Sequence, residues 1–321
     1  MAGKVGPRLG FGCFPLTGGY GAIAPGQGIR VIHAVLDAGV RILDTSDAYA
    51  AGANEELVGL GMAGRRDSVV LCTKFGWVLD AAGNAVRLDS SPAHVRRSCE
   101  ASLGRLKTDY IDLYFQHRRD PAVPIEETVG ELVRLQEEGK VRSIGLSEVA
   151  VATLKRAHAV MPVTALQTEY SLWSREPEAE LLPTCERLGV TFMAYSPLGR
   201  GFLTGHIRSA DALEADDYRR TNPRYQATSI QRNLALVDRL AEVGRRLGHT
   251  PSQLALAWLL AQPWGVAPIF STRSVEHFAE NLKALDIDLA PADLALIGDS
   301  VPSASVHGAR HPEAHMKTIN Q

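Results

Sequence analysis

The stretch Arg41-Ile42-Leu43-Asp44-Thr45-Ser46-Asp47-Ala48-Tyr49 decides the fold that this sequence predicts. It begins as a short apolar strand and stops at a carboxylate, Asp44. Two later strands stop in a similar way, at Lys74 after residues 69–71 and at His117 after residues 111–115. Polar residues that follow successive parallel strands meet at one end of a barrel or sheet. These three side chains are therefore expected to form one catalytic floor, with the Tyr49 phenol beside it.

Strands and helices alternate along most of the chain. Eight strands are expected, beginning near residues 9, 41, 69, 111, 141, 164, 191 and 266. This order is typical of an α/β fold of the single-domain (β/α)8 TIM-barrel type, and it competes with a doubly wound open sheet. The barrel is favoured because no linker divides residues 1–321, and because the polar residues follow at least five strands rather than one switch point.

Local signals place the helices between these strands. They are expected over residues 29–36, 54–62, 92–106, 125–138, 154–160, 178–188, 231–247, 252–261 and 275–285. Ser91-Pro92 and Thr250-Pro251 are typical helix starts, whereas Gly139 and Gly189 are stop signals.

Two segments fall outside this alternation. Residues 199–229 are polar and far longer than an ordinary loop, so they are predicted to form a lid, with a disordered loop as the alternative. Residues 300–321 form a C-terminal tail. His307, His311 and His315 recur in it every four residues, but Gly308 and Pro312 interrupt a helix there. The tail is therefore interpreted as surface rather than as a metal site.

The composition excludes several classes of protein. The 321 residues carry a formal net charge of -2, with 45% hydrophobic and 22% charged residues. Because no lysine and arginine block forms a phosphate-binding stripe, neither nucleic acid nor an anionic membrane is expected as a partner. No apolar run typical of a signal peptide is found, and the most apolar helix, near residues 254–260, is too short to cross a bilayer. These features predict a cytoplasmic globular protein.

The four cysteines lie far apart and without a Cys-x-x-Cys pair, so neither a zinc site nor a disulfide framework is indicated. They are Cys13, Cys72, Cys99 and Cys185. A glycine motif, Gly59-Leu60-Gly61-Met62-Ala63-Gly64, matches the dinucleotide pattern G-x-G-x-x-G. A dinucleotide fingerprint follows a strand and opens a helix, whereas this motif ends a helix, so its glycines are interpreted as helix terminators.

The carboxylate, ammonium and phenol suggest acid catalysis when they occur together. Alone, a strand-end aspartate or lysine is more often an ordinary salt bridge. A phenol with a pKa of about 10 is a poor acid near neutral pH. Lys74, held by Asp44, is expected to stabilise the phenolate and lower the pKa of Tyr49. Tyr49 could then protonate a developing alkoxide, with a hydrogen bond from His117. The chemistry alone does not distinguish Tyr49 from Tyr20, Tyr114 or Tyr195 in this role.

Several blocks in the right order resemble a known family. They are residues 39–46 with Tyr49, 54–59, 73–76, 109–117, 139–147, 167–170 and 195–201. Together they give the sequence, from about residue 9 to residue 289, a strong similarity to the aldo-keto reductase family. The resemblance implies a barrel that binds NADPH/NADP+ without a Rossmann fold, with NADH disfavoured.

The resemblance also implies roles for individual residues. Tyr49 would be the general acid, Asp44 and Lys74 its tuning pair, and His117 the residue that orients the carbonyl. Gln167 would hold the nicotinamide carboxamide and Tyr195 would stack on its ring. The other implied cofactor contacts are Ser147, then Ser196, Leu198, Gly199 and Gly201 towards the pyrophosphate, and Thr272, Arg273, His277, Glu280 and Asn281 at the adenosine end. Among these, Arg273 is the expected contact of the 2′-phosphate.

Three positions depart from the family pattern. Glu148 stands where many members have an asparagine that contacts the carboxamide, so Gln167 could carry that contact alone. Phe270-Ser271 replaces a common proline-glycine pair, and His277 replaces an arginine. Towards the substrate, Phe14, Tyr20 and Trp77 could form an apolar wall and Arg118 could meet an anionic group; packing in the core or on the surface is the alternative for each.

The predicted function is NADPH-dependent reduction of aldehydes, dicarbonyls or activated ketones by direct hydride transfer. The alternative is an NADPH-binding regulatory subunit resembling the β-subunits of potassium channels, which share this fold and turn over slowly. A third reading is a barrel enzyme without nicotinamide. The partner is expected to be a small-molecule carbonyl compound, and the sequence leaves its identity and the protein's self-association open.

Overall fold

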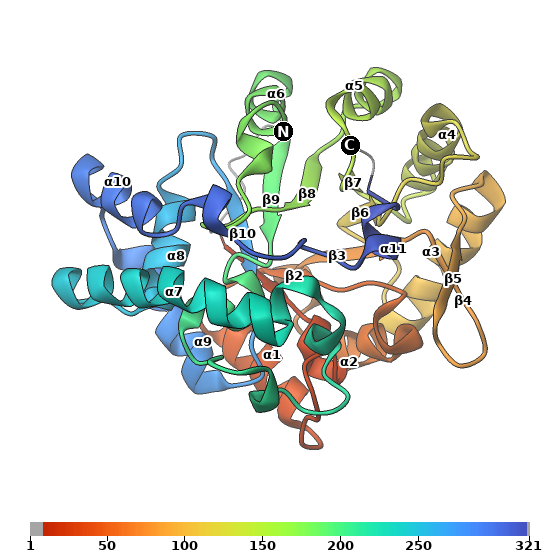
Figure 1. Ribbon diagram of the computed structural model, residues 1–321. Helices are drawn as coiled ribbons and strands as arrows, with labels where there is room; N and C mark the ends of the chain where they lie inside the picture. The colour runs from red at the N-terminus through yellow and green to blue at the C-terminus, as the bar shows by residue number, and fades with distance from the viewer. Residues whose placement is uncertain (1–8, 320–321) are drawn as a thin grey trace.

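Eight parallel strands close into a barrel in the computed structural model, which describes residues 9–319 (Figure 1). They are β1 (Gly10–Gly12), β2 (Ile42–Asp44), β3 (Val70–Phe75), β6 (Leu113–Gln116), β7 (Ile144–Ser147), β8 (Ala165–Glu169), β9 (Thr191–Tyr195) and β10 (Ala267–Phe270). Their order around the barrel is β1-β10-β9-β8-β7-β6-β3-β2. Because β1 pairs with both β2 and β10, the sheet has no open edge. The predicted barrel is confirmed and the open sheet is excluded.

Helices surround the barrel. They are α1 (Gln27–Asp37), α2 (Ala53–Gly61), α3 (Pro92–Leu106), α4 (Ile125–Glu137), α5 (Val151–Val160), α6 (Leu181–Leu188), α7 (Ala227–Leu247), α8 (Pro251–Leu260), α9 (Val275–Leu282), α10 (Pro291–Ser300) and α11 (Glu313–Met316). The predicted helix starts are confirmed: Ser91 accepts from the His94 N–H, and Thr250 and Gln253 form a capping box. Gly189 ends α6 with φ 68°, as a stop signal does.

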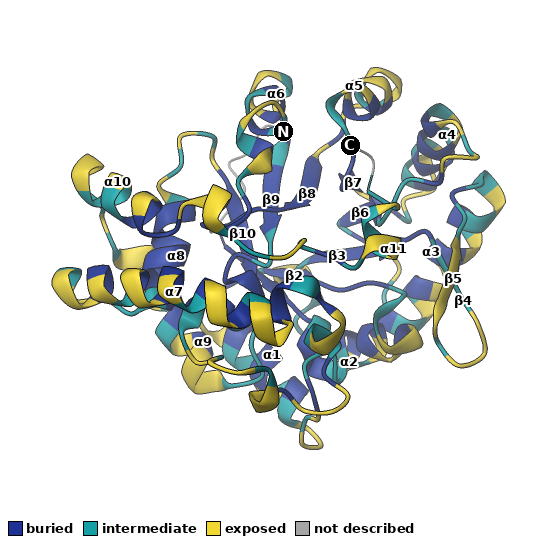
Figure 2. Ribbon diagram, viewed as in Figure 1, coloured by how far each residue is buried: buried dark blue, intermediate teal, exposed yellow. Residues whose placement is uncertain are grey.

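The core has two layers. Side chains inside the barrel are Ile42, Cys72, Leu113, Phe115, Ala165, Met193, Ala267 and Ile269. A larger apolar cluster fills the space between the strands and the helices. Figure 2 shows the barrel strands largely buried and the exposed residues on the outer faces of the helices. The four cysteines are buried free thiols. This packing fixes the strand ends at which the polar residues lie.

Several elements differ from the sequence prediction. A hairpin of β4 (Trp77–Leu79) and β5 (Ala85–Leu88) follows β3, and α10 precedes the tail; neither was expected. Helix α6 begins at Leu181 rather than at residue 178, because Glu176–Glu178 form a separate 3-10 turn. Helix α7 begins at Ala227, so it includes the last residues of the predicted lid. Short 3-10 turns occupy much of the remaining segment, and its role as a lid stays a prediction.

The glycine motif of residues 59–64 is only partly a helix terminator. Gly64, with φ 72°, lies in the turn after α2. Gly59 and Gly61 lie inside α2, where they allow close packing. A Cβ atom at Gly59 would lie 2.7 Å from the backbone oxygen of Leu106, and one at Gly61 would lie 2.8 Å from the Ile32 side chain. Contact with α3 and α1 therefore requires glycine at these two positions.

The C-terminal segment crosses the open end of the barrel. Figure 1 shows it, in dark blue, running from α10 over the strand ends to α11. Over residues 9–319 no helix is long and apolar enough to cross a membrane, and no cluster of three or more potential metal-ligating side chains occurs.

Candidate active site

A tight turn after β2 presents Tyr49 to the barrel mouth. The Tyr49 N–H donates to the Ser46 carbonyl at 3.1 Å, and the chain then passes through Ala50 and Ala51 with φ 48° and 50°. This left-handed backbone costs an alanine roughly 1–2 kcal/mol, so the surrounding structure must hold it. Strain of this kind is typical of functional sites.

Lys74 joins the Asp44 carboxylate to the Tyr49 hydroxyl. Its Nζ lies 2.5 Å from Asp44 Oδ1, 2.7 Å from the Thr45 carbonyl and 3.3 Å from Tyr49 Oη. Three partners use all three donors of this fully buried ammonium. The second Asp44 oxygen accepts from Gln167 Nε2 at 2.8 Å. The structure thus brings together four residues that the sequence singled out.

The electrostatics of this cluster differ from the prediction in one respect. Burial is the largest single effect and disfavours the charged form of Lys74, but the charges and hydrogen bonds of Asp44 and Tyr49 together outweigh it, so the pKa of Lys74 is raised. The expected fall in the pKa of Tyr49 is wrong for this structure. Burial raises the pKa of Tyr49 above 10, and the neighbouring Lys74 only partly opposes that rise. Tyr49 therefore stays protonated at neutral pH.

His117 faces Tyr49 as a neutral ring. The two rings meet edge to face with centroids 5.9 Å apart. Burial and then the positive charges of Arg118 and Lys74 hold the pKa of His117 well below 6.5. Its Nδ1 lies 3.1 Å from Ser46 Oγ, a partner that sequence reasoning missed although Ser46 stands in the opening stretch. A neutral imidazole keeps one N–H to donate.

A cavity of about 280 Å³ opens above this cluster. It brings together the predicted catalytic residues Asp44, Tyr49 and His117, the predicted substrate residues Phe14, Tyr20, Trp77 and Arg118, and the predicted cofactor residues Ser147, Gln167, Tyr195 and Ser196. Arg200, Tyr218, His311 and His315 also line this cavity, although none of them was predicted as a site residue. The roles of all these residues stay predictions, but their assembly in one cavity does not depend on those roles.

A second cavity, of about 580 Å³, continues from the first. Both are lined by Tyr20, Ser196, Arg200 and Ser271. The second cavity also collects most of the remaining predicted cofactor residues, namely Leu198, Gly201, Thr272, Arg273, His277, Glu280 and Asn281. Gly199 is not among its lining residues; it packs against Trp173, where a Cβ atom would lie 2.5 Å from the indole. The two cavities form an extended groove that suits a long ligand.

The far end of this groove carries positive and aromatic groups. Arg273 Nη1 donates to the Ala22 carbonyl at 2.7 Å and lies 3.7 Å from Glu214 Oε1. The His277 and His206 rings stack with centroids 6.0 Å apart. Ser274 caps α9 just after Arg273, which directs a helix N-terminus at the cavity wall. An anion such as a ribose phosphate would meet favourable charge here.

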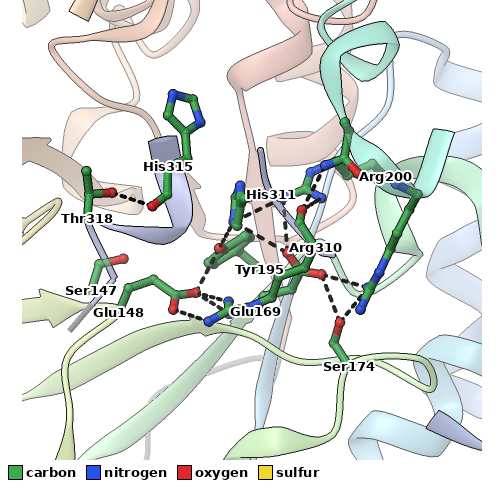
Figure 3. Close-up of polar contacts among 12 residues, drawn as sticks. Ser147, Glu148, Glu169, Ser174, Tyr195, Arg200, Arg310, His311, His315 and Thr318 are labelled. Carbon is green, nitrogen blue, oxygen red and sulfur yellow. Dashed lines mark hydrogen bonds and ion pairs between the residues drawn. The ribbon is translucent and has the colours of Figure 1, made fainter. Parts of the chain in front are cut away.

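Glu148 has a role that its place in the sequence did not reveal. Its carboxylate accepts from the Glu169 N–H at 3.0 Å, from Tyr195 Oη at 2.8 Å, and from both terminal nitrogens of Arg310 at 2.6 and 2.8 Å (Figure 3). The Glu148 carboxylate is therefore bound to Arg310 of the C-terminal segment and to the Tyr195 hydroxyl. Burial favours a higher pKa for Glu148, but the hydrogen bonds and charge of Arg310, the charge of Arg118 and the Glu169 N–H together lower it.

The interpretation of residues 307–315 as a surface tail is wrong for His311. This residue is only 6% exposed, and its Nε2 lies 3.0 Å from Tyr195 Oη and 3.4 Å from Arg200 Nη2 (Figure 3). Burial and then Arg200 lower the pKa of His311 to about 2, so the ring is neutral. The four-residue spacing of the histidines suggested that their side chains lie on one side of the segment. It did not indicate that the segment folds back over the barrel.

Hydrogen bonds from Arg200, Asn222 and Asn233 hold the backbone of this C-terminal segment in place. The Arg310 carbonyl accepts from Arg200 Nη1 at 2.9 Å and from Asn222 Nδ2 at 2.8 Å. Asn233 forms two backbone hydrogen bonds with His307. As a result, parts of the predicted lid and of the predicted tail form one wall beside the cavity that Tyr49 and His117 line.

Comparison with known proteins gives consistent matches. A family model described as the Aldo/keto reductase family matches residues 8–301. A probable aldo-keto reductase 1 from Glycine max is 42% identical over 306 residues, which cover 95% of this chain and 88% of the relative. A solved glycerol dehydrogenase from Gluconobacter oxydans is 30% identical with a TM-score of 0.82, covering 91% of this chain and 90% of that chain. An aldo/keto reductase from Klebsiella pneumoniae, solved in complex with NADP and acetate, is 31% identical with a TM-score of 0.74 and 95% coverage of both chains.

Proposed function

This chain belongs to the aldo/keto reductase family, and we propose that it reduces aldehydes, dicarbonyls or activated ketones to alcohols with NADPH. The observation that carries the proposal is the buried bond series from Asp44 through Lys74 to Tyr49, placed where two connected cavities meet the barrel mouth. A structural salt bridge alone would not need a phenol that opens into a cavity.

The residues of the extended groove fit NADPH. Its larger cavity offers Arg273 and the N-terminus of α9 to a 2′-phosphate, and Ser196 and Leu198 line the passage towards the catalytic residues. Near Tyr49, Gln167 and Tyr195 line the smaller cavity, where a nicotinamide carboxamide and ring would find a hydrogen-bonding amide and an aromatic face. When bound, NADPH supplies the hydride. The solved relative from Klebsiella pneumoniae in complex with NADP supports this choice of cofactor.

Tyr49 is the proposed proton donor. Its raised pKa keeps the hydroxyl protonated, and the Lys74 ammonium 3.3 Å away stabilises the negative charge that the oxygen acquires as its proton leaves. Asp44 keeps Lys74 charged and in place. The pair therefore favours proton transfer at the moment when an alkoxide develops, without exposing a free phenolate beforehand.

His117 is proposed to orient the carbonyl oxygen. Because Ser46 Oγ can donate to Nδ1, we assign the ring proton to Nε2, which then donates towards the position where the carbonyl oxygen meets Tyr49. The low pKa of His117 keeps the ring neutral, so it acts as a hydrogen-bond donor and does not compete with Tyr49 as an acid.

A turnover assay with 4-nitrobenzaldehyde tests the proposed function. Purified protein should oxidise NADPH in the presence of this aldehyde and form the alcohol in equal amount. The assay is paired with a sizing column and with a test for bound cofactor. A tetramer that retains NADPH but shows negligible turnover would instead support the regulatory-subunit alternative. Absence of any NADPH fluorescence change would support a barrel enzyme without nicotinamide.

A further inference from the structure

Arg118 is a cation of the catalytic cavity with unused donors. It directly follows His117 and lines the same cavity as Tyr49. Its Nη1 donates to the His117 carbonyl at 2.6 Å and to Ser147 Oγ at 3.2 Å. A guanidinium has five N–H donors. Within residues 9–319 no carboxylate lies within 4.0 Å of it, and its Nε and Nη2 form no hydrogen bond.

The rest of the cavity wall does not neutralise this charge. Among the described lining residues the carboxylate is Asp44, which is paired with Lys74. The other arginine of the wall, Arg200, is paired with Glu169 at 3.0 Å. The three lining imidazoles are neutral, because burial and the nearby arginines lower the pKa of His117, His311 and His315. Arg118 is therefore the unpaired charge of this wall.

The charge of Arg118 reaches the groups around it. It contributes to lowering the pKa of His315 and opposes the rise in the pKa of Tyr49 and Tyr218. These residues come from the turn after β2, from residues 218–221 and from α11, so the guanidinium lies among elements that converge on the cavity. The charge of Arg118 also contributes to the lowered pKa of Glu148, but the Glu148 carboxylate forms its ion pair with Arg310.

We propose that Arg118 forms an anion subsite and that the preferred substrates are small carbonyl compounds that carry a carboxylate. The inference rests on the proposed reductase function. The planar guanidinium can receive a carboxylate through Nε and Nη2 in two parallel hydrogen bonds, the geometry that arginine favours. Ser147 and the His117 carbonyl hold Nη1, which leaves the other edge free for the ligand. A cavity of about 280 Å³ restricts such substrates to compact molecules.

The alternative is that Arg118 contacts the cofactor rather than the substrate. The cavity that collects Arg273 and the pyrophosphate candidates does not include Arg118 among its lining residues. Arg118 lies instead beside His117, at the end of the groove where the carbonyl is expected. The two occupants predict different effects: a substrate subsite changes the preference between charged and neutral aldehydes, whereas a cofactor contact changes NADPH affinity and affects all aldehydes alike.

A matched substrate pair tests the subsite. The pair is 4-formylbenzoate and its neutral methyl ester, assayed with NADPH in the wild type and in Arg118→Gln. We expect the wild type to favour the carboxylate in kcat/KM by at least about tenfold, and Arg118→Gln to lower that ratio by about 10- to 100-fold, as for loss of a charged hydrogen bond. Arg118→Lys should retain part of the preference, because it keeps the charge and loses the paired geometry.

Two controls complete the test. Arg156→Gln removes an equal charge from an exposed ion pair between α5 and α4 and should leave the ratio unchanged. In the wild type, benzoate should inhibit turnover of the ester competitively, whereas benzamide should not. This measurement tests the subsite even if the Arg118 variants do not fold. A wild-type preference for the ester, or an Arg118→Gln variant that loses NADPH affinity and both activities equally, would overturn the subsite. Turnover of the ester tests the reductase function separately.

Discussion

Arg310 and Glu148 form a buried, two-bonded ion pair between the C-terminal segment and the end of β7. Their side chains are only 11% and 1% exposed. Because the Tyr195 hydroxyl donates to the same carboxylate, this pair also fixes the edge of a ring that lines the catalytic cavity. A segment at the far end of the chain therefore helps to shape the site.

Replacing Arg310 should be costly. Arg310→Met leaves Glu148 as an uncompensated buried carboxylate, which typically destabilises a protein by about 3–5 kcal/mol. The exposed pair of Arg156 and Glu126 has a similar two-bonded geometry, so Arg156→Met is the matched control and should cost far less stability than Arg310→Met. Denaturant unfolding measures both. Equal losses in the two variants would contradict the role assigned to burial, and Arg310→Met with Glu148→Gln should recover part of the stability.

Ser46 should act as a positioning residue for His117. Ser46→Ala removes the partner of Nδ1, so both tautomers of the ring become accessible. We expect kcat for 4-nitrobenzaldehyde to fall about tenfold, equivalent to ~1.4 kcal/mol, with no change in the Kd of NADPH. Steady-state kinetics and fluorescence titration separate these effects. A parallel loss of cofactor affinity would show that the mutation disturbs the whole site instead.

Asp47 should make the protein less stable as pH rises. Burial and then the neighbouring Glu55 raise the pKa of Asp47 to about 7, although Arg105 opposes them. The unfolded chain loses this proton near pH 4. Between these values the folded state holds more protons, so the free energy of unfolding falls as pH increases from about 4 to 7. Asp47→Asn should flatten that fall when unfolding is measured at pH 5 and pH 8; an unchanged slope would contradict the prediction.

Two glycines in neighbouring helices should respond in opposite ways to the same substitution. At Gly59 in α2 an added Cβ atom would lie 2.7 Å from the Leu106 oxygen, so Gly59→Ala should destabilise the protein by about 1–3 kcal/mol. At Gly104 in α3 nothing lies within 4 Å of an added Cβ atom, so Gly104→Ala should stabilise it by about 0.5–1 kcal/mol. Thermal unfolding of the two variants checks the sign, and the same sign in both would count against the packing described here.

Sequence patterns predicted the barrel because its elements depend on local signals. Apolar strands with Asp44, Lys74 or His117 at or next to their ends, and caps such as Thr250, are determined within a few residues. The β4–β5 hairpin was missed because its two strands pair only with each other and are largely exposed or half-buried, so no long apolar run marks them.

The wall around the site could not be predicted in the same way. Glu148 and Arg310 are 162 residues apart, and no local pattern joins them. The sequence shows the four-residue spacing of His311 and His315. This spacing cannot distinguish a surface tail from a segment that folds back over the barrel. The sequence correctly indicated that the charge of Lys74 lowers the pKa of Tyr49. The larger, opposing effect of burial depends on how the cavity is assembled. Quantities set by long-range packing need the structure.

The central claim is that Tyr49 is the acid of a carbonyl reductase, and Tyr49→Phe tests it most directly. This variant keeps the ring that packs against Phe14 and His117 and removes only the hydroxyl. With NADPH and 4-nitrobenzaldehyde, we predict that kcat falls at least about 100-fold, the usual contribution of a positioned proton donor, while the Kd of NADPH from fluorescence titration stays the same. Turnover at the wild-type rate in this variant would contradict the account.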